Sequence, residues 1–204
     1  MHPNPAFRHD DRALLAQIID DVGFGMVFAA TPDGPRVAHV PLLRRGDGHI
    51  AFHLARGNAL VRHIEQVPAL VVVNGPDGYV SPRWYDDMGQ VPTWNYVTVE
   101  CEGRVQRLTR DGLVDLLRDA SAQHEARLGG TPWTMDKVPD ATMSRLLDGI
   151  VGFELAITAW RPTFKLSQNK SAADRARAAE GMAAAGSGAI ATLMQALVPG
   201  DSKQ

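Results

Sequence analysis

The sequence predicts an α+β fold, mainly β, in which an antiparallel barrel carries flanking helices and C-terminal helices. Six or so strand-like segments are joined mostly by hairpin turns, and only one clear strand–helix–strand crossover interrupts them. A length of 204 residues is enough to bury one core without disulfides or a structural metal, so we expect a single domain over residues 1–204.

The first half of the chain opens with an amphipathic helix and continues in strands. Leucine and isoleucine recur at helical spacing between residues 10 and 20, and glycine-containing turns then separate β-rich runs. The predicted elements are a helix over Asp10–Asp20, strands over Gly23–Ala29, Arg36–Leu43 and His49–Ala55, a short helix over Asn58–Glu65, and a strand around Val71–Val73.

The second half alternates long strands with helices. A turn is expected at Gly75–Gly78, and Gly103 indicates a bulge or a barrel corner inside a long strand. The predicted elements are a strand over Asn95–Leu108, helices over Asp111–Arg127 and Asp140–Ile150, a last strand around Phe153–Ile157, and terminal helices over Ala172–Ala185 and Ala189–Val198.

Composition and charge argue against several classes of protein. The 21 basic and 23 acidic residues give a formal charge of -2, which does not favour a protein that grips many phosphates of a duplex. Seven histidines and the lone Cys101 show no paired metal-ligand spacing, so no metal is expected. Because the chain has neither a long apolar run nor a secretory start, we expect a cytoplasmic protein that does not enter a membrane.

The first candidate site is the junction between the strand over His49–Ala55 and the short helix that follows it. A helix start offers free backbone N–H groups, Arg56 adds a forked donor suited to phosphate oxygens, and His53 could supply one more donor. Asn58 is placed to cap the helix. From these residues alone the structural interpretation, a cap with a surface arginine and a barrel histidine, is favoured over an anion site.

The second candidate is a concentration of aromatic residues. Five of the seven Trp and Tyr residues lie between Tyr79 and Tyr96, among them Tyr85 and Trp94. Large rings held near prolines suit either stacking on a planar ligand or filling a subunit interface, and composition alone favours packing or an interface.

The third candidate is the polar segment that follows the last predicted strand. Lys165, Ser167 and Gln168 supply several short-range donors, which is the chemistry needed to hold a phosphate, a ribityl chain or the pyrimidine edge of a flavin. The simpler interpretation is a solvated loop with capping side chains, and it is favoured without further knowledge.

Five separated blocks nevertheless occur in the order found in one known family. They are His53–Asn58, Gly75–Tyr85, Val91–Tyr96, Ile150–Glu154 and Lys165–Asn169. Together they resemble the FMN-binding negative transcriptional regulators of the PaiB type, over the chain from its start to about Asp174. Two positions depart from the usual family pattern: Gly78 stands where alanine is common, and Ala59 where proline is common.

The resemblance implies a split β-barrel related to pyridoxamine-phosphate oxidases and flavin reductases, with FMN as cofactor and flavin sites at the interface of a homodimer. The implied flavin-binding residues are His53, Arg56 and Asn58 near the phosphate, Lys165, Ser167 and Gln168 along the polar part, and Trp94 or Tyr85 near the ring, with Thr93 also in the site. We expect the dimer interface to include the Tyr79–Tyr96 segment, because rings on a monomer's surface loop would leave a large apolar patch.

Three functions are compatible with this interpretation. The leading hypothesis is a flavin-linked regulator of gene expression, and the rival is an FMN-dependent oxidoreductase acting on a small molecule. A repressor that binds DNA directly would have to rely on the mildly basic stretch from Lys165 to Arg177, which lacks a recognition-helix pattern and is more simply a solvated face.

Overall fold

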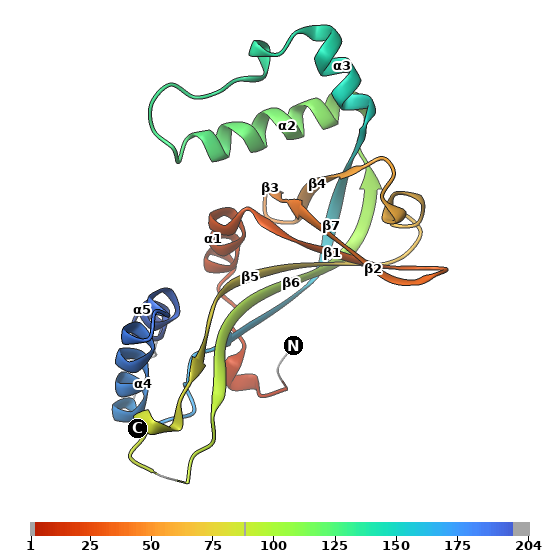
Figure 1. The fold of residues 1–204 in the computed structure, drawn as a ribbon. Helices are drawn as coiled ribbons and strands as arrows, with labels where there is room; N and C mark the ends of the chain where they lie inside the picture. The colour runs from red at the N-terminus through yellow and green to blue at the C-terminus, as the bar shows by residue number, and fades with distance from the viewer. Residues whose placement is uncertain (1–2, 88, 198–204) are drawn as a thin grey trace. The chain divides into compact units, whose positions relative to one another are not determined.

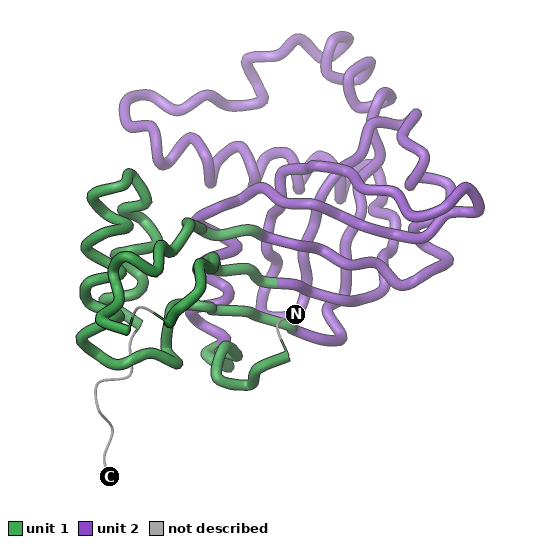
Figure 2. The backbone as a smooth tube through the Cα atoms, turned by 60° about the horizontal axis from the view of Figure 1, so that its bottom comes forward, with its two compact units in different colours: residues 1–11, 74–99, 161–204 green, residues 12–73, 100–160 purple. Residues whose placement is uncertain are grey.

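The computed structural model describes residues 3–87 and 89–197 and divides into two compact units (Figure 2). Among the described residues, unit 1 contains 3–11, 74–87, 89–99 and 161–197, and unit 2 contains 12–73 and 100–160. Three strands pass from one unit into the other along the chain. The expectation of a single domain stays a prediction.

Seven strands form one sheet in the order β2-β1-β5-β6-β7-β4-β3 (Figure 1). Their bounds are β1 Phe24–Thr31, β2 Gly34–Pro41, β3 Leu43–Arg45, β4 His49–Ala55, β5 Ala69–Val80, β6 Thr93–Arg107 and β7 Ile150–Lys165. The pairs β1–β2, β1–β5, β3–β4 and β4–β7 are all antiparallel. The predicted α+β fold with a mainly antiparallel sheet is therefore confirmed.

Unit 2 is built around the inner faces of its strands. Phe52 of β4 pairs with Phe153 of β7 in the sheet register, and their stacked rings lie 5.8 Å apart at the centroids with no exposed surface. A side chain at Gly103 in β6 would collide with the carbonyl of Ala156, so the backbones approach closely there. The predicted bulge or corner at this glycine stays a prediction.

The helices of unit 2 are α1 Arg12–Val22, α2 Arg110–Glu125 and α3 Asp140–Asp148. On α2, Leu113 and Leu116 are buried in a cluster with Leu43 and Ala51, so this helix covers β3 and β4. The side chain of Arg127, just beyond α2, donates to the carbonyl oxygens of the last turn of α1. The two helices are thereby tied together.

Unit 1 contains the far ends of β5, β6 and β7 together with α4 Ala172–Ala184 and α5 Gly188–Ala196. The two C-terminal helices pack against each other (Figure 1) and bury small and flexible residues, chiefly Ala178, Ala179, Met182 and Met194. Residue 198, the predicted end of the last helix, lies outside the described residues.

Three predicted elements were wrong in detail. The helix over Asn58–Glu65 is only a single turn of 3-10 helix, Ala59–Arg62. Gly75–Gly78 is no turn but lies inside β5, and β7 continues to Lys165 instead of ending near Ile157. In the last two cases pairing with neighbouring strands outweighs the local turn signal.

Candidate functional site

Unit 1 holds a polar cluster, formed by the buried residues Tyr85, Asn95 and Ser167 and the partly buried residues Thr93 and Lys165. Asn95 has no exposed surface, and its Nδ2 donates to Ser167 Oγ at 2.9 Å and to Met194 Sδ at 3.3 Å. Ser167 stands at a φ of 61°, the left-handed region that L residues rarely adopt. Strand β6 and the segment after β7 thus place their polar side chains together.

The hydroxyl of Tyr85 is the unexplained atom of this cluster. It is buried and makes no hydrogen bond of normal geometry with any group of residues 3–87 and 89–197, and the nearby Ser167 hydroxyl interacts with it only weakly. Burial raises the pKa of Tyr85, and the hydroxyl of Ser167 lies close enough to oppose that shift. An orphaned buried hydroxyl costs about 1–3 kcal/mol, so it calls for a partner beyond the chain.

Two lysines bring positive charge to the same cluster. Lys165 Nζ donates to Thr93 Oγ1, and Lys170 Nζ donates to Gln90 Oε1 and lies 5.2 Å from the ring centroid of Tyr85. The pKa of Lys165 is lowered, first by burial and then by the charge of Lys170. Lys165 forms no ion pair with a carboxylate among the described residues. A bound anionic group would therefore interact favourably with its ammonium group.

Gln168, predicted to face a flavin, is held by its own segment. Its Oε1 accepts from the backbone N–H of Leu166 at 2.7 Å, and its Nε2 donates to the carbonyl of Phe164. The Gln168 amide therefore shapes the turn that sets the Ser167 backbone. The donors of this segment that could face a ligand are those of Lys165 and Ser167.

Trp94 lies on β6 beside the cluster but points to the surface. Its side chain is 55% exposed and meets Tyr79, which is 46% exposed, edge to face with ring centroids 6.1 Å apart. Val91 nearby in sequence is 74% exposed. These apolar side chains form an exposed patch of the kind that a partner surface covers.

The residues predicted to hold phosphate lie in unit 2. Arg56 Nε donates to the carbonyl of Asp148 at 2.5 Å and its Nη2 to that of Ile150 at 3.2 Å, so much of the guanidinium is occupied. Asn58 Oδ1 accepts from the N–H of Leu60 at 2.9 Å, as a cap does. A single 3-10 turn offers little dipole, so only the remaining N–H groups of Arg56 are left for an anion.

His53 lies on β4 opposite Gly152 and is partly buried. Burial lowers its pKa, which keeps the imidazole neutral. A neutral imidazole still offers one N–H donor to a ligand.

Sequence reasoning missed a set of residues that hold the segment around Tyr85 in place. The guanidinium of Arg177 on α4 donates to the carbonyl of Trp84 at 3.2 Å and pairs with Asp86 at 2.7 Å and with Asp174 at 2.6 Å. Asp174 also accepts from the N–H of Asp86 at 3.1 Å. Residues on both sides of Tyr85 are therefore anchored to α4, a link that no local pattern signals.

Contacts of the same kind engage three of the four basic residues in the stretch from Lys165 to Arg177. Arg177 is paired with two carboxylates, and Lys165 and Lys170 bind uncharged side chains of unit 1. These side chains do not form an open row of free cations of the kind that grips a nucleic-acid backbone. The stretch is part of the fold and of the candidate site.

Two absences apply only to the part of the chain that the structure describes. Within it, no helix is long and apolar enough to cross a membrane. Over the same residues no three His, Cys, Asp or Glu side chains gather as metal ligands would. The cytoplasmic location stays a prediction.

Comparison with solved structures supports the fold. The flavocytochrome Anf3 from Azotobacter vinelandii is 16% identical, with a TM-score of 0.59 over 80% of this chain and 72% of that chain. The FAD and heme binding protein from Mycobacterium smegmatis is 19% identical, with a TM-score of 0.56 over 77% of this chain and 72% of that chain. The architecture is thus one that flavin-binding proteins use.

Comparison of sequences shows the family. The "Protease synthase and sporulation protein PAI 2" of Bacillus subtilis is 32% identical over 160 residues, which are 76% of each chain. A protein of Aspergillus fumigatus is 30% identical over 168 residues, 66% of this chain and 64% of that one. Residues 1–159 match the family described as "Putative FMN-binding domain", a range that ends before Lys165. The chain belongs to this FMN-binding domain family, and FMN, the cofactor expected from the sequence, is the cofactor of the family.

Proposed function

We propose that the polar cluster of unit 1 holds FMN, and that the resulting flavoprotein acts as a flavin-linked regulator of gene expression. The observation that carries the proposal is the buried hydroxyl of Tyr85 without a hydrogen-bond partner, in a cluster where Lys165 pairs with no carboxylate of the described residues. Both groups lack what a bound flavin offers, namely hydrogen-bond acceptors and negative charge.

The donor set fits FMN. The cofactor presents carbonyl oxygens and ring nitrogens on its pyrimidine edge, hydroxyls on its ribityl chain, and a phosphate. Lys165 supplies a cation, while Thr93 and Ser167 supply hydroxyls that can donate or accept. Exposed Trp94 offers a flat apolar face for a ring. Bound FMN would supply hydride or one-electron chemistry, which the protein's donors would tune.

Replacing Lys165 with Gln tests the site. The change removes a charge-assisted contact worth about 1.5–3 kcal/mol, so FMN affinity should fall by roughly one to two orders of magnitude. Parallel titration with riboflavin locates the contact: equal losses place Lys165 at the ring or ribityl chain, and a loss for FMN alone places it at the phosphate. Arg104→Gln, which removes an exposed charge elsewhere, is the control. Unchanged affinity for both flavins would remove the cluster from the proposal.

The regulatory role is supported by the B. subtilis relative, whose name links it to protease synthesis and sporulation. The formal charge of -2 and the paired arginine of α4 favour a role that does not rest on this chain gripping DNA by charge. Two measurements separate the alternatives. Anaerobic mixing of the flavin-loaded protein with a nicotinamide should leave the flavin oxidised, whereas rapid turnover would assign an FMN-dependent oxidoreductase. A sequence-specific gel shift at physiological salt would instead assign direct DNA binding.

A further inference from the structure

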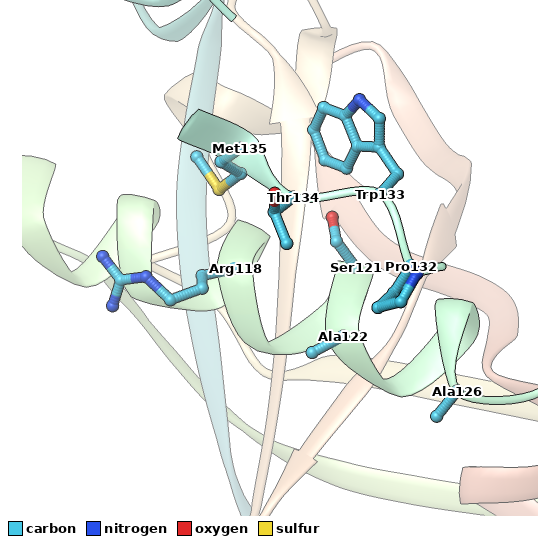
Figure 3. A pocket seen from close by; sticks show the side chains of 8 residues that line it. All are labelled: Arg118, Ser121, Ala122, Ala126, Pro132, Trp133, Thr134 and Met135. Atoms are coloured by element: carbon cyan, nitrogen blue, oxygen red, sulfur yellow. The ribbon is translucent and has the colours of Figure 1, made fainter. Parts of the chain in front are cut away.

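A hollow on the surface of unit 2 lies between α2 and the chain that follows it (Figure 3), and none of its residues belongs to the polar cluster. Its volume is about 210 Å³. The lining residues are Arg118, Ser121, Ala122, Ala126, Pro132, Trp133, Thr134 and Met135. An apolar cavity of about 150 Å³ is enough to take up a benzene ring, so this volume suits one or two fused rings.

The wall opposite α2 is fixed by hydrogen bonds. The backbone N–H of Trp133 donates to Glu125 Oε2 at 2.8 Å, which ties the loop to the end of α2. Lys137 Nζ donates to the carbonyl of Pro132 at 3.1 Å, and a short 3-10 turn, Met135–Lys137, follows. The hollow is therefore held open by the chain's own contacts.

The lining is apolar, and its charged neighbours are engaged elsewhere. Ala122 and Ala126 form a floor that ends at Cβ, and Figure 3 shows the Trp133 ring standing above the loop. Arg118 pairs with Asp115 at 2.7 Å, and its guanidinium points away from the indole (Figure 3).

Few polar atoms remain for a ligand. The Thr134 hydroxyl is hydrogen-bonded to the carboxylate of Asp136. The Ser121 hydroxyl has no hydrogen-bond partner among the residues that the structure describes. A molecule in the hollow would thus meet apolar surface and a single free hydroxyl.

We propose that this hollow binds a neutral aromatic molecule of one or two fused rings with one polar atom, of which indole is the probe. The ring would lie between the alanine floor and the face of Trp133, with its polar atom toward Ser121. A charged molecule is disfavoured because its charge would lose water without gaining a free counter-charge.

Titration of the full-length protein with indole, followed by the indole N–H resonance of Trp133 in ¹⁵N-correlated NMR, tests the proposal. A ligand of this size should bind with a dissociation constant on the order of 0.1–1 mM. Benzoate and tryptamine, which carry a carboxylate and an ammonium, should bind at least about tenfold more weakly.

Two filling variants and one control make the test specific. Ala122→Leu and Ala126→Leu place a larger side chain in the hollow and should each weaken indole binding by about tenfold or more. Ala183→Leu adds the same side chain at an exposed position of α4 that does not line the hollow and should leave binding unchanged. Circular dichroism checks that each variant is folded.

Three results would overturn the proposal. One is the lack of a saturable shift of the Trp133 resonance in the wild-type protein up to about 10 mM indole. Another is unchanged binding in both filling variants, which would move indole to a different site. The third is benzoate binding as tightly as indole, which would refute the neutral class of ligand.

Discussion

The indole ring of Trp84 lies against the backbone of Gly181, so closely that a Cβ on Gly181 would stand 2.5 Å from the indole nitrogen. The same tryptophan's carbonyl receives a hydrogen bond from Arg177, one turn earlier on α4. Helix α4 therefore holds Trp84 through both its ring and its backbone. Because Tyr85 follows Trp84 directly in the chain, these contacts also fix the position of the Tyr85 backbone.

Gly181→Ala should destabilise the protein although alanine is the better helix former. The helix-propensity gain is at most about 1 kcal/mol, while forcing a methyl group into the Trp84 ring costs about 1–3 kcal/mol. Urea denaturation gives the net change in the free energy of unfolding. Gly188→Ala at the start of α5, where a Cβ meets nothing within 4 Å, should be neutral or stabilising. Equal effects of the two changes would contradict the contact.

The family resemblance implies a contact of Arg56 with the FMN phosphate, a contact outside the polar cluster of unit 1. If that contact exists, Arg56→Ala should weaken FMN more than riboflavin, which lacks the phosphate. The expected loss is on the order of 1.5–3 kcal/mol for FMN. The variant should also lower the melting temperature, since Arg56 ties β4 to the carbonyls of Asp148 and Ile150. Arg62→Ala, an exposed arginine of the neighbouring 3-10 turn, is the control. Equal losses for both flavins would leave Arg56 with its structural role only.

Trp94→Ser should lower both dimer stability and flavin retention. The exposed pair of Trp94 and Tyr79 is the kind of apolar surface that a second copy would cover, and assembly and ligand binding are linked by mass action. Sedimentation at micromolar concentration, together with flavin absorbance, provides the readout. Trp133→Ser removes an exposed tryptophan outside the segment and should affect neither. The prediction fails if the wild type is a stable monomer, or if the variant dimer keeps its flavin affinity.

His53 should make the stability of the flavin-free protein depend on pH in the mildly acidic range. Burial lowers its pKa in the folded state, so below the usual value of about 6.5 the unfolded chain binds more protons. The free energy of unfolding should therefore fall as the pH drops from about 6.5 through the folded-state pKa. His53→Gln should flatten this part of the profile, and His49→Gln at the exposed start of β4 should not.

Much of the fold can be predicted from local patterns, because amphipathic helices and strands are recognisable from the residues of a short segment. The helices over residues 110–125 and 140–148 and the long strand through Gly103 were predicted within a few residues. Gly75–Gly78 misled because glycine and proline favour turns locally, while here their strand is held in a sheet by partners distant in sequence. The extent of β7 was missed for the same reason.

The candidate site was predictable in its residue types but not in its contacts. Lys165 and Ser167 look polar and solvated in the sequence, yet Ser167 is buried against Asn95, which was not among the predicted site residues. The anchoring of Trp84 by Arg177 joins positions 93 apart in the chain. Such pairings depend on tertiary packing, which a single sequence does not display.

The closeness of α4 and α5 to β5 also bears on how the chain can vary among its relatives. A Cβ on Gly78 would lie 2.6 Å from Met182 Cε and 3.0 Å from Ser187 Cβ. Helices α4 and α5 lie beyond the family-matched residues 1–159. Positions 78, 182 and 187 should therefore covary: a relative with alanine at the first needs a shorter side chain at the second or a shifted start of the last helix.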